Sequence, residues 1–349
     1  MMRKHRQTRA VLASCGLACV LVLVLWGGAS FSGDAGSDRA AWREKYRRPA
    51  EIPFPEGNPY SEAKFKLGRV LFFDPIMSGS ETRACATCHN PGLSWSDGLP
   101  RAIGEKQTIL ALRTPTLLNV AWGEQLGWDG HFRNLEAVAF GPLLSPGNMN
   151  MQEPQLIARL SAIPGYVDAF HTAFGEGAIT RRKIELALAT FERSIVSTEA
   201  PFDRWIKGDE HAISEQAKRG FDVFNGKANC AACHSGWAFT DNSFHDVGVA
   251  RDIDIGRGKL FPKSTKLLHA FKTPTLRDVT RRAPFMHDGS VATVDAVIDL
   301  YDRGGIDRPS RADEIKPLGL TGGEKEDLMA FLNTLSGKPE PVTAPPLPR

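Results

Sequence analysis

The sequence predicts an all-α fold made of two repeated units with long, Gly- and Pro-rich loops. Helical apolar spacing recurs along the chain, whereas no long alternating strand pattern appears. The motif C-x-x-C-H occurs twice, as CATCH at 85–89 and as CAACH at 230–234. This motif indicates covalent attachment of a c-type haem. We therefore expect two cytochrome c-type haem domains, related by an internal repeat.

Residues 1–30 have the layout of a secretory signal peptide. A basic start that contains Arg3, Lys4, Arg6 and Arg9 precedes an apolar run at 11–26 and then small residues. An uncleaved anchor through residues 11–29 is the alternative, because the apolar run is close to the length of a membrane span. Either way the sequence predicts export and a periplasmic location.

The net charge and the cysteine content exclude several classes of function and site. Removing residues 1–30 takes four positive charges from the formal net charge of +3 and leaves about −1, so the sequence offers no argument for nucleic-acid binding. Two of the six cysteines lie in this leader, and the other four all belong to the C-x-x-C-H motifs. The mature chain therefore has no cysteine for a disulfide or a separate metal site.

Composition and capping signals divide the rest of the chain. A Pro-rich tether at 31–59 precedes an N-terminal haem domain at 60–205, a C-terminal haem domain at 206–340 and a tail at 341–349. Ser61 and Ser214 are predicted N-caps of similar helices. A further helix is expected over 181–195, and Thr321 with Glu324 forms a capping box for a last helix closed by Gly337.

The repeat extends beyond the cysteine motifs. RTPTL at 113–117 matches KTPTL at 272–276, and the alignment continues without a gap to the Ala-Val pairs at 137–138 and 296–297. The second copy carries about fourteen extra residues between its haem motif and this block. The two halves are therefore read as copies of one haem-binding unit.

The two predicted haems differ on the face opposite the motif histidine. The proximal ligands are His89 beside Cys85 and Cys88, and His234 beside Cys230 and Cys233. The sixth ligand decides whether a haem iron reacts or only conducts electrons. The repeat alignment sets Pro142, which has no side-chain donor atom, opposite Tyr301, which can ligate iron through its phenolate oxygen. Tyr301 is alternatively an aromatic residue that packs at a helix end.

Over residues 60–337 the chain resembles the bacterial di-haem cytochrome c peroxidases, and within them the branch of MauG, the maturation enzyme of methylamine dehydrogenase. The resemblance rests on both haem motifs together with LGRVLFFDP at 67–75, TPTLLNV at 114–120, WDG at 128–130, PFMHDG at 284–289 and LYDRGG at 300–305. It implies that Tyr301 is the axial ligand of the second haem, with Met286 as the alternative. It also implies that Trp128 lies between the haems and relays electrons, although Trp128 is alternatively a buried structural residue. Because residues 93–112 contain no His, the resemblance implies a first haem that is open at rest.

The chain departs from this family at two places. Asn148 stands where the family has a distal Glu for acid–base catalysis, and an amide cannot shuttle a proton. Glu153 and His131 are the candidate substitutes. Arg113 stands where the family often has an Asn that contributes to an inter-haem calcium site, and a guanidinium cannot ligate calcium. A calcium ion between the haems therefore stays possible from the resemblance, but Arg113 argues against it.

The resulting hypothesis is an oxidoreductase of the cytochrome c peroxidase type. It reduces hydrogen peroxide at the N-terminal haem with electrons that a small cytochrome c or cupredoxin delivers through the C-terminal haem. One alternative is MauG-like oxidation of Trp or Tyr side chains in a partner protein. Another alternative is a non-catalytic electron-transfer or haem-sensor protein. Asn148 supports this alternative, because its amide cannot supply acid–base catalysis.

Overall fold

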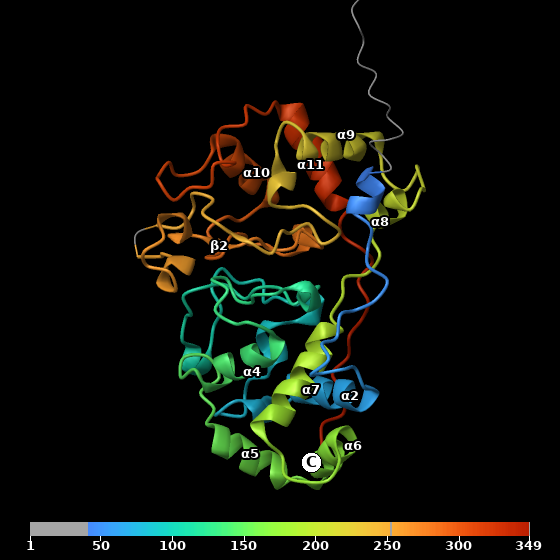
Figure 1. Cartoon of the computed structure of the whole chain (residues 1–349), viewed down its shortest axis with the longest axis vertical. Coiled ribbons are helices and arrows are strands. Elements are labelled where there is room, and N and C mark those ends of the chain that lie inside the picture. Colours follow the sequence, from blue (N-terminus) through green and yellow to red (C-terminus); the bar gives the residue numbers. More distant parts are fainter. Residues whose placement is uncertain (1–40, 252, 349) are drawn as a thin grey trace, which may run out of the picture.

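The computed structural model describes residues 41–251 and 253–348, so the predicted leader lies outside the described residues. The fold is rich in helix and contains little sheet, as the sequence predicts. Figure 1 shows two halves stacked along the long axis, with α2 and α4–α7 in one half and α8–α11 in the other. The helices and strands are α2 (Glu62–Phe73), α3 (Cys85–Cys88), α4 (Leu135–Leu144), α5 (Glu153–Ser161), α6 (Pro164–Phe174), α7 (Arg181–Arg193), α8 (Pro201–Ile206), α9 (Glu215–Asn225), α10 (Val294–Arg303), α11 (Gly322–Asn333), β1 (Phe244–His245) and β2 (Phe271–Lys272).

In the first half, α2 crosses α7 at a glycine. Ser61 caps α2 as predicted, because its side chain accepts a hydrogen bond from the Lys64 backbone N–H. A Cβ atom on Gly68 would lie 2.0 Å from the Ala187 carbonyl oxygen, so only glycine permits this close approach. The crossing anchors a hydrophobic cluster that extends from Leu67 to Ile195.

The second half repeats this arrangement with α9 and α11. Ser214 caps α9, and a Cβ on Gly220 would lie 1.9 Å from the Asp327 carbonyl oxygen of α11. The predicted capping box of Thr321 and Glu324 opens α11. The helix ends at Asn333, before the predicted stop at Gly337, which instead packs tightly against Thr198.

Elements after each haem motif also match at the repeat offset of 159 residues that separates Arg113 from Lys272. Helices α4 and α10 begin and end at this offset, as do the 3-10 turns at Val120–Trp122 and Val279–Arg281. The bridges Leu126↔Phe132 and Phe285↔Val291 match in the same way. Within the described residues, the sheet consists of β1 and β2, two antiparallel strands in the second half.

The two ends of the described chain cross over between the halves. Tyr46, within the segment predicted as a tether, is fully buried in the cluster of the second half, and Trp42 lies edge-on to Phe221. At the other end, Arg69 donates a hydrogen bond to the Thr343 carbonyl, and Pro348 lies against Gly165 of α6. Both end segments therefore pack against the opposite half, and Figure 1 shows the last residues running down to α6.

The packing boundary between the halves lies earlier than the sequence suggests. Phe202, Trp205 and Ile206 of α8 belong to the second cluster, whereas the first cluster ends at Ile195. The change of cluster therefore falls between 195 and 202 rather than at 205/206. Within residues 41–251 and 253–348, no helix is both long enough and apolar enough to cross a membrane.

Candidate di-haem site

A single cavity of about 690 Å³ lies between the halves and reaches both C-x-x-C-H motifs. All six motif residues predicted to hold haem line its wall, together with apolar side chains from α4, α7 and α10. The six are Cys85, Cys88, His89, Cys230, Cys233 and His234. The four cysteines carry free thiols, as haem attachment through their sulfur atoms requires.

Both motif histidines are fixed by a backbone carbonyl. The Nδ1 atom of His89 lies 3.2 Å from the Trp95 oxygen, and that of His234 lies 2.9 Å from the Phe239 oxygen. Because a carbonyl only accepts hydrogen bonds, Nδ1 carries the proton and Nε2 keeps a free lone pair for iron. Burial lowers the pKa of both side chains, which favours the neutral, ligating form.

The residues predicted to distinguish the two haems, Pro142 and Tyr301, occupy matching places in α4 and α10, and both line the cavity. Burial raises the pKa of Tyr301, and the cysteines Cys230 and Cys233 are close enough to act on it electrostatically. A phenolate at this place therefore needs a cation beside it, such as a haem iron. Met286 lines the same cavity, so Tyr301 as the ligand stays a prediction.

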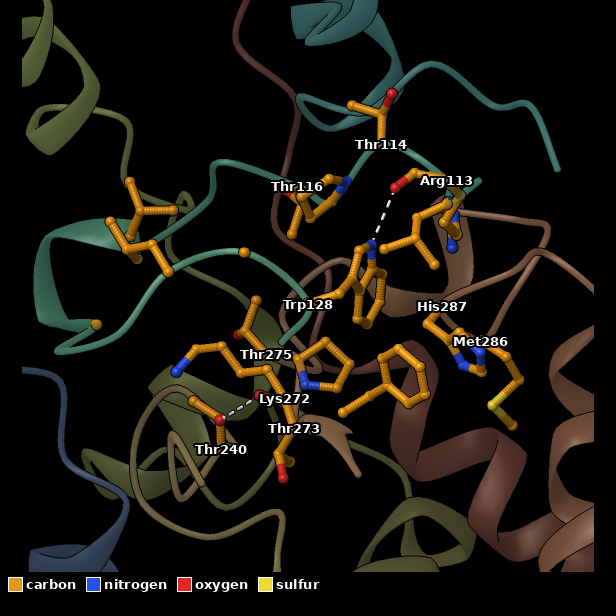
Figure 2. Close-up of a pocket in the computed structure, with 18 of the residues that line it drawn as sticks. Arg113, Thr114, Thr116, Trp128, Thr240, Lys272, Thr273, Thr275, Met286 and His287 are labelled. Atoms are coloured by element: carbon orange, nitrogen blue, oxygen red, sulfur yellow. Dashed lines mark hydrogen bonds between the residues drawn. The ribbon is translucent and has the colours of Figure 1, made fainter. Parts of the chain in front are cut away.

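Trp128 lies at the contact between the halves, next to Arg113 and His287 (Figure 2). Its Nε1–H donates a 2.9 Å hydrogen bond to the Arg113 carbonyl. Two backbone hydrogen bonds cross between the halves at this point, from Lys272 N–H to the Trp128 carbonyl (2.8 Å) and from Arg113 N–H to the His287 carbonyl (3.0 Å). The two donors, Arg113 and Lys272, are 159 residues apart in the sequence, and so are the two acceptors, Trp128 and His287. Each half therefore donates one hydrogen bond to the other half and accepts one from it.

His287, the repeat equivalent of Trp128, is a site residue that the sequence reasoning missed. Its ring stacks on Phe271 with centroids 3.6 Å apart, and it lies edge-on to Trp128 at 6.4 Å. Its Nε2 lies 2.7 Å from the Asp254 carboxylate. The repeat alignment could have identified His287, because it aligns this residue with Trp128.

Asn148 lines the cavity, and its backbone is held on both sides. Its N–H donates to the Ser145 carbonyl, and its own carbonyl accepts a 2.7 Å bond from Glu105 N–H. The side-chain amide makes no hydrogen bond to another described residue. It can therefore offer its N–H group to a molecule in the cavity.

The two candidate substitutes for a distal acid do not reach the cavity. Glu153 lies at the start of α5, where Arg181 holds its carboxylate at 3.2 Å. His131 is exposed and packs edge-on against Phe132, because the turn after Trp128 directs it outward. This placement does not support an acid–base role for either residue, and both roles stay predictions.

Glu192 is a second residue that the sequence reasoning missed. It lies in the cavity wall, and burial raises the pKa of its carboxyl from 4.5 to about 8. The sequence contains a pattern that indicates this burial. Ile184, Leu188 and Glu192 follow one another at intervals of four residues, so Glu192 lies on the same buried face of α7 as the two apolar residues. Within the described chain, the other acids that line the cavity are Asp129 and Glu314.

A second cluster of ligating side chains lies beside the second motif. Cys233, Asp241 and His245 bring one potential ligand atom each within 4.8 Å of one another. The Asp241 carboxylate raises the pKa of His245 to about 10, with a further contribution from Cys233. Because haem attachment converts the Cys233 thiol into a thioether, the cluster is better described as an Asp–His ion pair than as a metal site.

The cavity fits two covalently attached haems. It offers two pairs of thiols, two histidines with a free Nε2, apolar walls and buried cationic side chains without a carboxylate partner. Among these, the buried Nε atom of Arg113 has no hydrogen-bond partner in the described chain. An acidic group that enters the cavity would satisfy it.

Comparisons with known proteins agree with this geometry. Residues 62–211 match the family model of the di-haem cytochrome c peroxidases. The chain is 50% identical over 325 residues to the methylamine utilization protein MauG of Methylorubrum extorquens, which covers 92% of each chain. It is 30% identical to the cytochrome c551 peroxidase of Pseudomonas aeruginosa over 86% of each. The crystal structure of a MauG-like protein associated with microbial copper homeostasis superimposes with a TM-score of 0.77 at 30% identity, over 83% of this chain and 94% of that chain.

Proposed function

The chain belongs to the family of di-haem cytochrome c peroxidases that includes MauG, and from this premise we propose that it reduces hydrogen peroxide at the haem of the first motif. As a member of this family it is an oxidoreductase that binds two c-type haems. Electrons enter from a small cytochrome c or cupredoxin through the haem of the second motif. A haem with one open axial position binds and cleaves peroxide, whereas a haem with two protein ligands transfers electrons.

The observation that carries this proposal is the difference between Pro142 and Tyr301 at matching places of α4 and α10. Pro142 offers no donor atom, so it leaves the first site open to a small molecule. Tyr301 offers a phenolic oxygen at the second site, where the buried phenol lies near Cys230 and Cys233. The same fold thereby supplies one reactive and one conducting position.

The residues of the chain have separate tasks in this reaction. Cleaving the O–O bond of hydrogen peroxide consumes two electrons and two protons and yields two water molecules. His89 would hold the iron of the first haem through its free Nε2 atom, and the Asn148 amide would orient peroxide by a hydrogen bond without donating a proton. Trp128, held between the halves by Arg113 and Lys272, relays electrons from the second site. The donor protein is oxidised by two electrons for each peroxide.

A second candidate function is oxidation of side chains in a partner protein. The identity of 50% over nearly the whole chain to a methylamine utilization protein MauG favours it. In that reaction the electrons that reduce peroxide come from Trp or Tyr residues of the partner. The haem sites and Trp128 would serve both reactions in the same way.

Mixing the diferric holoprotein with hydrogen peroxide and reduced cytochrome c tests the proposal. We expect oxidation of two cytochromes per peroxide, and its loss when Cys85→Ser and Cys88→Ser remove the first haem. Peroxide consumption that stays independent of cytochrome c, but oxidises a co-purified protein detected by mass spectrometry, would favour the second candidate. Turnover no faster than that of free haem would favour a non-catalytic haem sensor.

Three further expectations belong to this proposal. The two halves are copies of one haem-binding unit, which the matching α4 and α10 support. Residues 1–30 direct export to the periplasm, with residues 11–29 as an anchor if they are not cleaved. A calcium ion between the haems is not favoured, because Arg113 occupies the position expected for a calcium-binding Asn.

A further inference from the structure

Two buried arginines meet where the halves contact each other. Arg113 comes from the first half and Arg282 from the second, and each side chain is 7% exposed. The Arg113 Nη2 atom donates a 2.9 Å hydrogen bond to the Arg282 carbonyl. Both side chains line the cavity between the motifs.

Neither guanidinium forms an ion pair with a carboxylate of the described chain. Arg113 Nη2 otherwise contacts only the Ser96 hydroxyl, and its Nε is without a partner. Arg282 donates to the carbonyls of Thr275 and Asp278. Burial and the charge of Arg113 lower the pKa of Arg282 to about 10, so the two cations oppose each other. The Asp278 carboxylate acts on Arg282 in the opposite direction, and Asp97 does so on Arg113, but neither carboxylate reaches ion-pair distance.

Such an arrangement needs an anion. Burying one unpaired ion costs several kcal/mol even after relaxation, and two guanidinium groups side by side increase that cost. Guanidinium groups bind carboxylates through paired, charge-assisted hydrogen bonds. Each haem carries two propionate carboxylates, and the cavity that receives the haems is the one that both arginines line.

We propose that Arg113 and Arg282 bind propionate carboxylates of the attached haems and place a fixed positive charge between the two haem sites. The charge lies beside Trp128, whose indole N–H is bonded to the Arg113 carbonyl. Because guanidinium groups have no lone pair and repel cations, the same space does not hold a divalent cation. This inference rests on the two-haem content of the family and not on which substrate is oxidised.

Spectroelectrochemical titration of the holoprotein tests the proposal without measuring turnover. Removing a positive charge makes reduction of a nearby iron less favourable, so Arg113→Gln and Arg282→Gln each lower the midpoint potential of at least one haem. Arg113→Lys keeps the charge and stays close to the wild type. The matched control is Arg182→Gln, on an exposed face of α7, which leaves both potentials unchanged. Unchanged potentials in both Gln variants, with full haem content, overturn the proposal.

Two further experiments use the wild-type protein, so that the proposal can still be tested if the Gln variants do not bind haem. Treatment with EDTA, and exchange of chloride for phosphate at constant ionic strength, leave both potentials unchanged if haem carboxylates occupy the site. A shift with EDTA identifies a bound cation, and a shift with the anion identifies a free anion; either result contradicts the proposal. A crystal structure of the holoprotein must show a propionate oxygen at about 2.7–2.9 Å from Arg113 or Arg282.

Discussion

Asn148→Glu is expected to accelerate the reaction with hydrogen peroxide. The substitution puts a carboxylate where the wild type has an amide, and so adds a group that can take a proton from one peroxide oxygen and return it to the other. General acid–base help of this kind contributes about 10²–10⁴-fold in rate. That range corresponds to about 3–5 kcal/mol of activation free energy.

The structure indicates that the new carboxylate would be well placed. Hydrogen bonds to Ser145 and from Glu105 hold the backbone of Asn148, and Gly104 packs so closely that an added Cβ would lie 2.0 Å from the Gly147 oxygen. The side chain already lines the cavity. Partial burial raises the pKa of a carboxyl there toward neutrality, which suits proton transfer at working pH.

Stopped-flow mixing of the diferric protein with peroxide measures the rate constant directly from the change in the haem spectrum. Asn148→Gln is the matched control, because it adds the same methylene group without an ionisable group. An equal acceleration in both variants would show that added length, and not proton transfer, is responsible. A rate within a few-fold of wild type in Asn148→Glu, with an unchanged resting spectrum, would refute the placement of Asn148 beside the reacting haem.

Four further predictions follow from the site and its packing. Tyr301→Phe removes the proposed axial oxygen, so the absorption spectrum of the low-spin haem should change while the other haem keeps its bands; an unaltered spectrum excludes Tyr301 as a ligand. Trp128→Phe leaves both resting spectra intact but slows electron transfer between the haems in stopped-flow measurements, and an unchanged rate argues against the relay. Because burial raises the pKa of Glu192 to about 8, the folded state keeps a proton that the unfolded chain releases, so the free energy of unfolding falls as pH rises from about 5 to 8. Glu192→Gln removes this fall, which chemical denaturation at both pH values measures. Gly68→Ala forces a Cβ against α7 and should cost about 1–3 kcal/mol in a denaturation experiment, whereas Gly323→Ala, which meets nothing within 4 Å, should be nearly neutral.

The sequence predicted features that depend on short-range chemistry. Ser61 and Ser214 cap their helices because a hydroxyl reaches a backbone N–H three residues ahead, and the haem motifs are complete within five residues. The repeat offset also located the paired elements α4 and α10. These signals are read from neighbouring residues, so they do not depend on how the halves meet.

The contact between the halves could not be read in the same way. Arg113, Arg282 and His287 come together through hydrogen bonds between residues far apart in the chain. Glu153 is a candidate acid because it is close to Asn148 in the sequence. In the structure, however, its carboxylate pairs with Arg181 of another helix and does not line the cavity. His131 follows Trp128 closely, yet His131 is exposed whereas Trp128 lines the cavity. Such outcomes depend on the tertiary packing.

The crossed chain ends have a consequence for how far each half depends on the other. Each half takes its outermost segment from the far end of the polypeptide, with Tyr46 filling the core of the second half and Pro348 covering α6 of the first. A gene split at the boundary would give one product with an exposed aromatic arm and another with an empty space in its core. The two halves are thereby committed to each other, so neither can be expressed alone without a new covering for its surface.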